Sequence, residues 1–318
     1  MNGQNPALSR EVIIGVVATV LFFLSMMLIP VVGIAAGVFA PLPTLISCCR
    51  WGRPAGYFVP AGAAVVGSVV LSYLGAAPSI PYYCAMLCLG LLLGTGVRQQ
   101  WSLEKTIAGS SLAVFGMGAA VFWFTFSGAE GGMVKYLEND LKGAVSLAIQ
   151  QYATGEEEKR ILEEAFHAIV PVLVRMRPGA ALASALFISW LNLLVMKRTC
   201  PVFGLPVPQW GEWSRWKAPE QFVWAVIGGG FLLFVPSSGL RFLAANVLLV
   251  LGTVYLFQGL AIAAFYFEKW KLPRFLRAVI YAFLLLQQFA TLGVILVGLF
   301  DIWLDFRRLS RKAPLKEE

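Results

Sequence analysis

Charged residues are scarce in this chain. Asp, Glu, Lys and Arg account for 13% of its 318 residues and hydrophobic residues for 58%, whereas an average soluble protein carries about 25% charged residues. The mean hydropathy of +0.75 excludes an ordinary soluble domain and predicts a membrane protein. Because a backbone in lipid must satisfy its own hydrogen bonds, we expect an all-α fold, a polytopic bundle of transmembrane helices.

Signatures of catalysis and of metal binding are also missing. The chain has one histidine, His167, and contains no GxSxG, HExxH, P-loop or GxGxxG motif. Its five cysteines include no CxxC pair, so packing is their expected role. The expected spans hold no Asp, Glu, Lys, Arg or His in their interiors, which disfavours a proton-coupled pump with a buried carboxylate. We therefore expect no enzymatic activity, no cofactor and no metal ion.

Basic residues outnumber acidic ones by 25 to 17, which gives a formal net charge of +8. They gather in short loops, such as Arg50 to Arg53 and Lys197 to Arg198, and near the end of the chain. This distribution follows the positive-inside rule for cytoplasmic loops, so we expect no nucleic-acid partner. The predicted location is a bacterial cytoplasmic (inner) membrane, crossed several times, with the first apolar run as a permanent span.

The first 127 residues predict an N-terminal bundle of about five spans. Glu11 to Cys49 is almost unbroken apolar sequence, interrupted by prolines. Two joined spans are the favoured interpretation of this stretch, and one span followed by a broken segment is the alternative. Further spans are expected at Gly56 to Leu74, Tyr82 to Val97 and Ile107 to Phe126.

Residues 128 to 177 differ in composition from the rest. They are rich in acidic residues and contain no apolar run of span length. Apolar residues recur at helical spacing from Val134 to Tyr152 and again from Ile161 to Ile169, which predicts two amphipathic helices. We expect an acidic extracytoplasmic insertion that caps the bundle.

Residues 178 to 318 predict a C-terminal bundle of three to four spans with a basic tail. These spans are expected at Pro178 to Met196, Gln221 to Pro236, Leu240 to Phe267 and Ala278 to Phe300. The whole chain thus has eight or nine spans. Both flanks of the last span are basic, although a single crossing would place them on opposite sides, so one flank violates the rule unless some segment does not cross fully.

Uncharged polar residues occur where a span usually has none. Gln258 shares a helix face with Tyr255, and Gln288 lies in the last span. One interpretation is interhelical hydrogen bonding; the other is that these faces line a cavity that holds a polar, uncharged group of a ligand. The predicted substrate-binding residues are Asn246, Tyr255, Gln258, Tyr281 and Gln288.

Charges return at the end of the last span. Asp301 and Asp305 are spaced i, i+4, and Arg308 follows Asp305 by three residues. A salt-bridged helix end accounts for this spacing; docking of a membrane or cytoplasmic protein partner, with Arg307 as a fourth docking residue, is the alternative. Two carboxylates are too few ligands for a metal site.

Three sets of residues carry a resemblance to a known family. They are Pro41-Leu-Pro43 with Arg50 and Gly52, Asn246 with Tyr255 to Leu260, and Asp301 to Arg307. With them the chain resembles the YybS-like family of uncharacterised bacterial multi-spanning membrane proteins. The first six spans are more distantly similar to the substrate-binding S components of energy-coupling-factor transporters. That resemblance implies a six-helix solute binder, energised by a separate ATPase module through small residues on the first span, here Gly15 and Thr19.

The sequence therefore predicts a transporter-type integral membrane protein. It would bind a small uncharged or largely apolar solute in a cavity between the C-terminal spans, with any energy supplied by a separate partner. The alternative is a membrane scaffold or anchor for protein partners that has no transport activity. An intramembrane enzyme acting on lipid ranks last because catalytic groups are missing.

Overall fold

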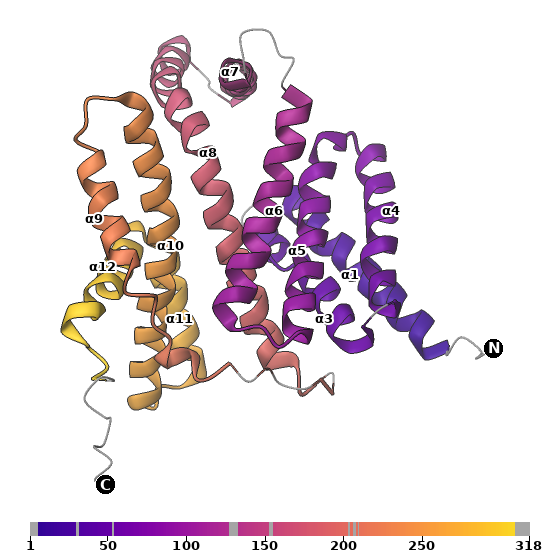
Figure 1. The fold of residues 1–318 in the computed structure, drawn as a ribbon. Helices are drawn as coiled ribbons and strands as arrows, with labels where there is room; N and C mark the ends of the chain where they lie inside the picture. Colours follow the sequence, from indigo (N-terminus) through magenta and orange to yellow (C-terminus); the bar gives the residue numbers. More distant parts are fainter. Residues whose placement is uncertain are drawn as a thin grey trace. The chain divides into compact units, whose positions relative to one another are not determined.

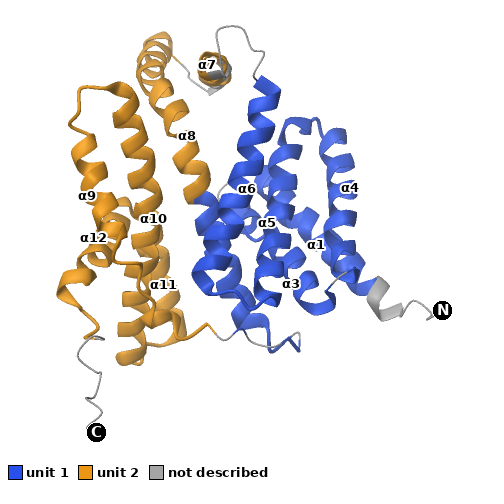
Figure 2. Cartoon of the chain, viewed as in Figure 1, with its two compact units in different colours: residues 1–128, 184–209 blue, residues 129–183, 210–318 orange. Residues whose placement is uncertain are grey.

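Helices joined by turns and irregular segments make up the part of the chain that the structure describes, and no strand occurs there. The computed structural model describes residues 6–29, 32–52, 54–126, 133–152, 155–202, 204–205, 208 and 210–308 (Figure 1). The expected all-α fold class is confirmed for these residues. The helices form two compact units, residues 1–128 with 184–209 and residues 129–183 with 210–318 (Figure 2). We call them the N-terminal unit and the C-terminal unit.

The N-terminal unit brings helices together through glycines. Its elements are α1 (Pro6–Leu28), α2 (Val32–Gly37), α3 (Pro41–Trp51), η1 (Ala55–Tyr57), α4 (Phe58–Tyr73), η2 (Ala77–Ser79), α5 (Ile80–Arg98), α6 (Leu103–Phe126) and the last part of α8 (Glu156–Thr199). A Cβ on Gly90 would lie 2.6 Å from the Pro41 carbonyl oxygen, and one on Gly94 would lie 2.6 Å from Cys48 Cβ. The small residues of α5 therefore allow α3 to approach closely, as in other helix pairs in lipid.

The segment after α1 does not form a second full span. α2 has 6 residues and folds back onto the end of α1, where Ser25 Oγ donates a hydrogen bond to the Gly33 carbonyl at 3.3 Å. α3 has 11 residues and begins with Pro41, whereas a crossing helix needs about 17 or more. The structure thus shows the broken segment that was the alternative to two joined spans. Proline lacks a backbone N–H and favours the first turn of a helix, so a new helix begins at Pro41.

The C-terminal unit contains the helices that the sequence analysis singled out. Its elements are α7 (Met133–Tyr152), the first part of α8, η3 (Trp213–Arg215), α9 (Phe222–Leu232), α10 (Ser238–Lys269), α11 (Arg274–Leu286) and α12 (Gln288–Leu304). α10 confirms the expected helix over Leu240 to Phe267. α7 confirms the first amphipathic helix.

The second amphipathic helix and the expected sixth span form a single helix. α8 runs for 44 residues, with Pro171 and Pro178 inside it. Its residues 156–183 belong to the C-terminal unit and residues 184–199 to the N-terminal unit. The two units therefore meet in sequence within a helix, whereas the sequence analysis placed a boundary at residue 178, where proline is typical of a helix start.

Fewer described helices than the predicted eight or nine are long and apolar enough to cross a membrane. Six described helices are long and apolar enough to span a membrane, and the bent pair α11–α12 raises the number to at most seven. The predicted count of eight or nine is not confirmed. α9, in place of the expected span Gln221 to Pro236, has 11 residues; this length is about 16 Å, against a hydrocarbon core of about 30 Å.

The expected last span, Ala278 to Phe300, is broken. α11 and α12 meet at an angle of 98°, and Gln287 between them has an extended backbone (φ −89°, ψ 114°). The hydroxyl of Thr291 donates a hydrogen bond to the Leu284 carbonyl at 2.7 Å. This bond satisfies one of the carbonyls that the end of α11 leaves without a helical partner.

Both ends of the bent pair lie at the same end of α10. α11 starts five residues after α10 ends. At the far end of the pair, Phe306 follows α12, and its carbonyl accepts a hydrogen bond from Tyr266 Oη in the last turn of α10 at 2.9 Å. The two basic flanks therefore meet, and the conflict with the positive-inside rule disappears if the pair enters and leaves on one side.

Two glycines mark the place where α10 and α12 cross. A Cβ on Gly259 would collide with the Val294 carbonyl oxygen, and one on Gly298 would collide with the Tyr255 carbonyl oxygen. The two backbones are thus in direct contact. Only glycine leaves room for this approach, which sets the position of the end of α12.

Replacing Gly259 or Gly298 by alanine should destabilise the protein by about 1–3 kcal/mol, because the added methyl group overpacks a backbone contact. Gly252→Ala in α10 and Gly293→Ala in α12 are matched controls, since nothing lies within 4 Å of an added Cβ there. Thermal unfolding of the detergent-solubilised protein measures the difference. Equal melting temperatures for all four variants would contradict the close crossing.

The bent pair also predicts membrane topology. In a background without native cysteines, Lys271→Cys and Arg308→Cys should react with an impermeant thiol reagent from the same side of the membrane. Arg241→Cys, at the other end of α10, should react from the opposite side. Labelling of positions 271 and 308 from opposite sides would show instead that α11 and α12 together cross the bilayer.

Candidate functional site

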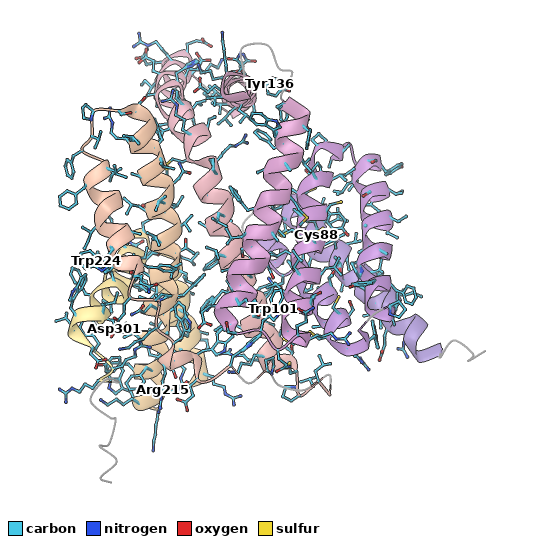
Figure 3. The ribbon with its side chains drawn as sticks, in the orientation of Figure 1. Cys88, Trp101, Tyr136, Arg215, Trp224 and Asp301 are labelled. Atoms are coloured by element: carbon cyan, nitrogen blue, oxygen red, sulfur yellow. The ribbon has the colours of Figure 1, made fainter. Side chains whose placement is uncertain are left out.

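Asp301 and Arg307 form a fully buried ion pair in the C-terminal unit. Arg307 Nη2 donates to Asp301 Oδ2 at 2.8 Å, and both side chains are 0% exposed. Asp301 lies near the end of α12 (Figure 3), and Arg307 lies in the turn that follows. Because an isolated buried charge costs several kcal/mol, each of the two residues needs the other.

Gln258 of α10 connects this ion pair to the loop before α9. Its Nε2 donates to Asp301 Oδ2 at 3.2 Å, and its Oε1 accepts a hydrogen bond from the Ala218 backbone N–H at 3.0 Å. The side chain is 0% exposed. Since protein groups bond to both the oxygen and the nitrogen of the amide, Gln258 acts as a bridge between α12 and the loop.

Arg307 holds the same loop from the other direction. Its Nη1 donates to the backbone carbonyls of Ser214 at 2.7 Å and Trp216 at 3.0 Å. We call Gln258, Asp301, Arg307 and the backbone of residues 214–218 the polar lock. It joins α10, α12, the loop before α9 and the turn after α12 through buried or part-buried hydrogen bonds.

The predicted docking residues occupy different environments. Asp301 and Arg307 are buried in the polar lock. Asp305 Oδ1 forms an ion pair with Lys217 Nζ at 3.2 Å. Arg308 is exposed and has a left-handed backbone (φ 51°). Residues 309–318, most of the predicted basic tail, lie outside the described residues. Docking through Asp305 and Arg308 stays a prediction.

Asn246 of α10 bonds to α8 beside Pro178. Its Oδ1 accepts a hydrogen bond from the Gly179 N–H at 2.5 Å, and its Nδ2 donates to the Arg175 carbonyl at 2.9 Å. The Arg175 carbonyl and the Gly179 N–H lie four residues apart on α8, one helical turn. Pro178, beside Gly179, has no backbone N–H to donate. For Asn246 the contacts favour the interpretation as an interhelical hydrogen bond.

The other predicted substrate-binding residues do not meet at one place. Tyr255 is buried, and its hydroxyl has no hydrogen-bond partner among the described residues. Tyr281 packs edge-on against the ring of Phe267, 5.2 Å between centroids. Gln288 is exposed at the first position of α12, 13 residues before Asp301 and thus about 20 Å along the helix from the contact with Gln258. The structure does not bring Gln258 and Gln288 together.

The N-terminal unit contains a second set of buried polar side chains. Ser111 of α6 and Ser189 of α8 share a hydrogen bond of 3.0 Å. Asn192, one turn further along α8, donates from Nδ2 to the Val38 carbonyl at 2.9 Å. The buried polar side chains described in this unit are therefore uncharged, and they lie within a mainly apolar interior.

Three atoms in this interior have no hydrogen-bond partner among the described residues. They are Thr44 Oγ1 in α3, Ser110 Oγ in α6 and Asn192 Oδ1 in α8, on side chains that are at most 2% exposed. An unpaired buried polar atom costs about 1–3 kcal/mol, so such atoms in native proteins usually bond to water or to a ligand. Only Asn192 was conspicuous in the sequence, because single serines and threonines are common in spans.

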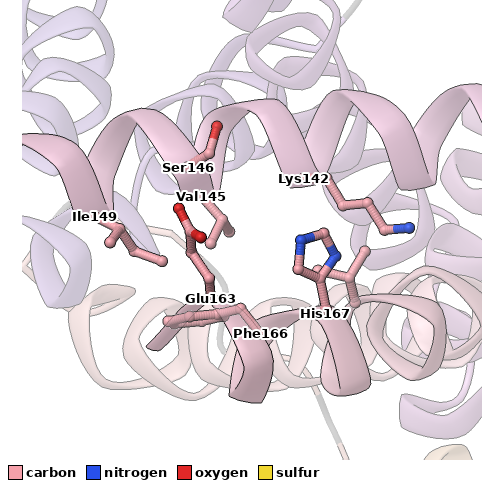
Figure 4. Close-up of a pocket in the computed structure, with 8 residues that line it drawn as sticks. Lys142, Val145, Ser146, Ile149, Glu163, Phe166 and His167 are labelled. Carbon is pink, nitrogen blue, oxygen red and sulfur yellow. The ribbon is translucent and has the colours of Figure 1, made fainter. Parts of the chain in front are cut away.

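Two concavities have other residues as their lining. A small groove of about 110 Å³ separates α7 from the first part of α8, with Lys142, Ser146, Glu163 and His167 along its walls (Figure 4). Its His167 is exposed, as expected for a surface histidine. A cavity of about 300 Å³ lies in the N-terminal unit and is lined by Cys48, Gly52, Tyr57, Thr95, Arg98 and Gln99. No residue predicted to bind substrate lines either of them.

The larger concavity is basic for a structural reason. Arg98 Nη1 donates to the Cys48 carbonyl at 3.5 Å, and both residues lie near the C-terminal ends of their helices, α5 and α3. A cation at a helix C-terminus is stabilised by the unpaired carbonyls there. This arrangement accounts for Arg98 without a bound anion.

Breaking the buried pair should cost far more than breaking an exposed one. Asp301→Asn leaves Arg307 buried without a countercharge and should lower the free energy of unfolding by about 3–5 kcal/mol. Asp305→Asn, which breaks the partly exposed pair with Lys217, should cost no more than about 1 kcal/mol. Denaturation of the detergent-solubilised protein measures both values.

A double variant tests whether the cost of Asp301→Asn comes from the unpaired charge that it leaves on Arg307. Asp301→Asn combined with Arg307→Met removes both charges, so it should be more stable than Asp301→Asn alone. If Asp301→Asn and Asp305→Asn unfold alike, the buried pair does not hold the unit together.

Comparison with known proteins shows the family of the chain. No curated protein and no solved structure matches it. The resemblances to the YybS-like family and to transporter S components are therefore not confirmed. The family described as "Predicted membrane protein (DUF2232)" matches residues 16–302, which include helices of both units. The chain therefore belongs to the DUF2232 family of predicted membrane proteins.

Proposed function

We propose that the protein binds a small uncharged solute inside the membrane, at buried polar side chains of its N-terminal unit. The observation that carries this proposal is the set of unpaired buried atoms on Thr44, Ser110 and Asn192. They lie on three different helices of one unit. Two hydroxyls and an amide oxygen suit a ligand with uncharged hydrogen-bonding groups.

The chemistry of this interior limits the class of solute. No acidic or basic side chain belongs to the buried polar set, and a charged ligand would therefore lack a countercharge. The chain also has no nucleotide-binding motif. If binding leads to transport across a bacterial cytoplasmic membrane, the energy comes from a partner protein or from the solute gradient.

A scaffold is the second candidate, and the polar lock favours it for the C-terminal unit. Gln258, predicted to face a ligand, bonds to protein groups through both ends of its amide. These two contacts favour a structural role for Gln258 over a role in binding a ligand. The two functions are compatible, since they concern different units of the same chain.

Removing an unpaired hydroxyl tests the solute proposal. Thr44→Val and Ser110→Ala keep the approximate shape of each side chain and delete one polar atom. We expect wild-type protein to retain a small polar compound, detected by mass spectrometry after purification, or to be stabilised by members of a panel of uncharged polar solutes. Both variants should lose that binding.

Thr19→Val is the matched control. Thr19 is also 0% exposed and lies in the same unit, but its hydroxyl already donates to the Gly15 carbonyl at 2.8 Å. It should leave solute binding unchanged. If Thr44→Val instead raises the stability of the protein by about 1–3 kcal/mol and changes no binding, the hydroxyl is merely unpaired and the proposal is wrong.

A further inference from the structure

The turn between α10 and α11 carries a basic surface that the proposed function does not use. Lys269, Lys271, Arg274 and Arg277 fall within nine residues, with Glu268 as their one acidic neighbour in the turn. None of the four forms an ion pair within the part of the chain that the structure describes. We call these four residues the basic turn.

Local contacts fix the backbone of the basic turn. Lys271 has a left-handed backbone (φ 52°), and the next residue, Leu272, donates from its N–H to the Phe267 carbonyl at 3.0 Å. The Leu272 carbonyl in turn accepts a hydrogen bond from Arg277 Nε at 2.8 Å. The turn therefore presents its cations from an ordered chain reversal at the end of α10.

An apolar stripe continues from the basic turn along α11. This helix has no buried residue. Phe275 is 80% exposed and Phe283 is 61% exposed, and with Val279 between them and Leu286 beyond they follow helical steps of four, four and three. Trp270, 63% exposed, lies beside the bases at the start of the stripe. Charge and apolar surface are thus arranged end to end along one element.

We propose that the basic turn and the stripe of α11 form a binding site for an anionic phospholipid. The bases hold the phosphate of the headgroup, Trp270 lies at the level of the interface, and an acyl chain follows Phe275, Val279 and Phe283. Tryptophan and a cluster of Lys and Arg beside a transmembrane helix are the features that anionic lipid recognition uses.

The dimensions favour a lipid over another anionic partner. α11 has 13 residues and is about 20 Å long, which is close to the roughly 15 Å of one leaflet of the hydrocarbon core. A nucleic acid or an acidic peptide would engage the bases but leave the apolar stripe uncovered. A phospholipid has the matching order of an anionic head followed by a long apolar tail.

The test compares two lipids on the full-length protein in detergent. Native mass spectrometry gives the dissociation constants of phosphatidylglycerol and phosphatidylcholine with identical acyl chains. Wild-type protein should prefer phosphatidylglycerol. Raising the salt concentration from about 0.1 M to about 0.5 M should weaken this preference, because salt screens the charges. Each cation near an anionic surface contributes about a fivefold preference, so Lys269→Gln/Lys271→Gln/Arg274→Gln should reduce it on the order of a hundredfold.

Two further variants make the result decisive. Lys159→Gln/Arg160→Gln/Arg241→Gln removes three basic residues elsewhere in the same unit, of which Lys159 is half-buried and the other two are exposed, and should keep the preference. Lys269→Arg/Lys271→Arg/Arg274→Lys keeps the three charges and should keep it as well, which guards against a folding defect. The proposal is overturned if wild-type protein binds both lipids alike, or if both neutralised triple variants lose the preference equally.

Discussion

Asp301 and Arg307 meet in the C-terminal unit at a point where neither side chain reaches solvent. In such a place every polar group must find its partner within the protein, because water cannot supply one. The ion pair meets most of this requirement together with its neighbours. Gln258 shares the carboxylate, and the loop carbonyls of Ser214 and Trp216 accept hydrogen bonds from Arg307 Nη1, while Arg307 Nε has no partner among the described residues. The path of the loop before α9 and of the turn after α12 therefore depends on these two charges.

The same requirement explains how the broken helices are tolerated. Each break leaves backbone groups without a helical partner, and side chains from nearby turns bond to them. Thr291 bonds to the Leu284 carbonyl beside the bend between α11 and α12. Asn246 bonds to α8 next to Pro178. Several polar residues of the described chain thus lie where helices are interrupted or cross. Buried polar atoms without a partner among the described residues remain in both units, such as Asn192 Oδ1 in the N-terminal unit and Tyr255 Oη in the C-terminal unit.

Several of these features could be predicted from the sequence. Apolar length and periodicity predicted the long helix around Gln258 and the amphipathic α7, because both signals are local. The prolines at 30, 41 and 43 indicated that the run from Glu11 to Cys49 is interrupted, but not whether a full span or a broken segment would follow the first span. Basic residues on both flanks of Ala278 to Phe300 indicated either that one flank breaks the positive-inside rule or that a segment does not cross fully. The bend at Gln287 has no Pro or Gly to mark it.

The polar lock could not be derived in the same manner. Its partners are separated by up to 93 positions, as between Arg307 and Ser214, and helical spacing relates only residues three or four apart. That spacing suggested a local pair of Asp305 with Arg308, whereas the structure shows ion pairs of Asp305 with Lys217 and of Asp301 with Arg307. A polar residue in a span signals that a partner exists, but the crossing of α10 and α12 decides which one.

Hydrogen exchange in lipid nanodiscs tests most directly whether the polar lock organises the C-terminal unit. The Ala218 amide is bonded to Gln258, and the Phe306 amide is bonded to Asp301 Oδ1 at 3.0 Å. Both should exchange as slowly as amides in the middle of α10, and both should lose protection together in Arg307→Met. Exchange of these two amides at the rate of an exposed loop in the wild-type protein would contradict the account.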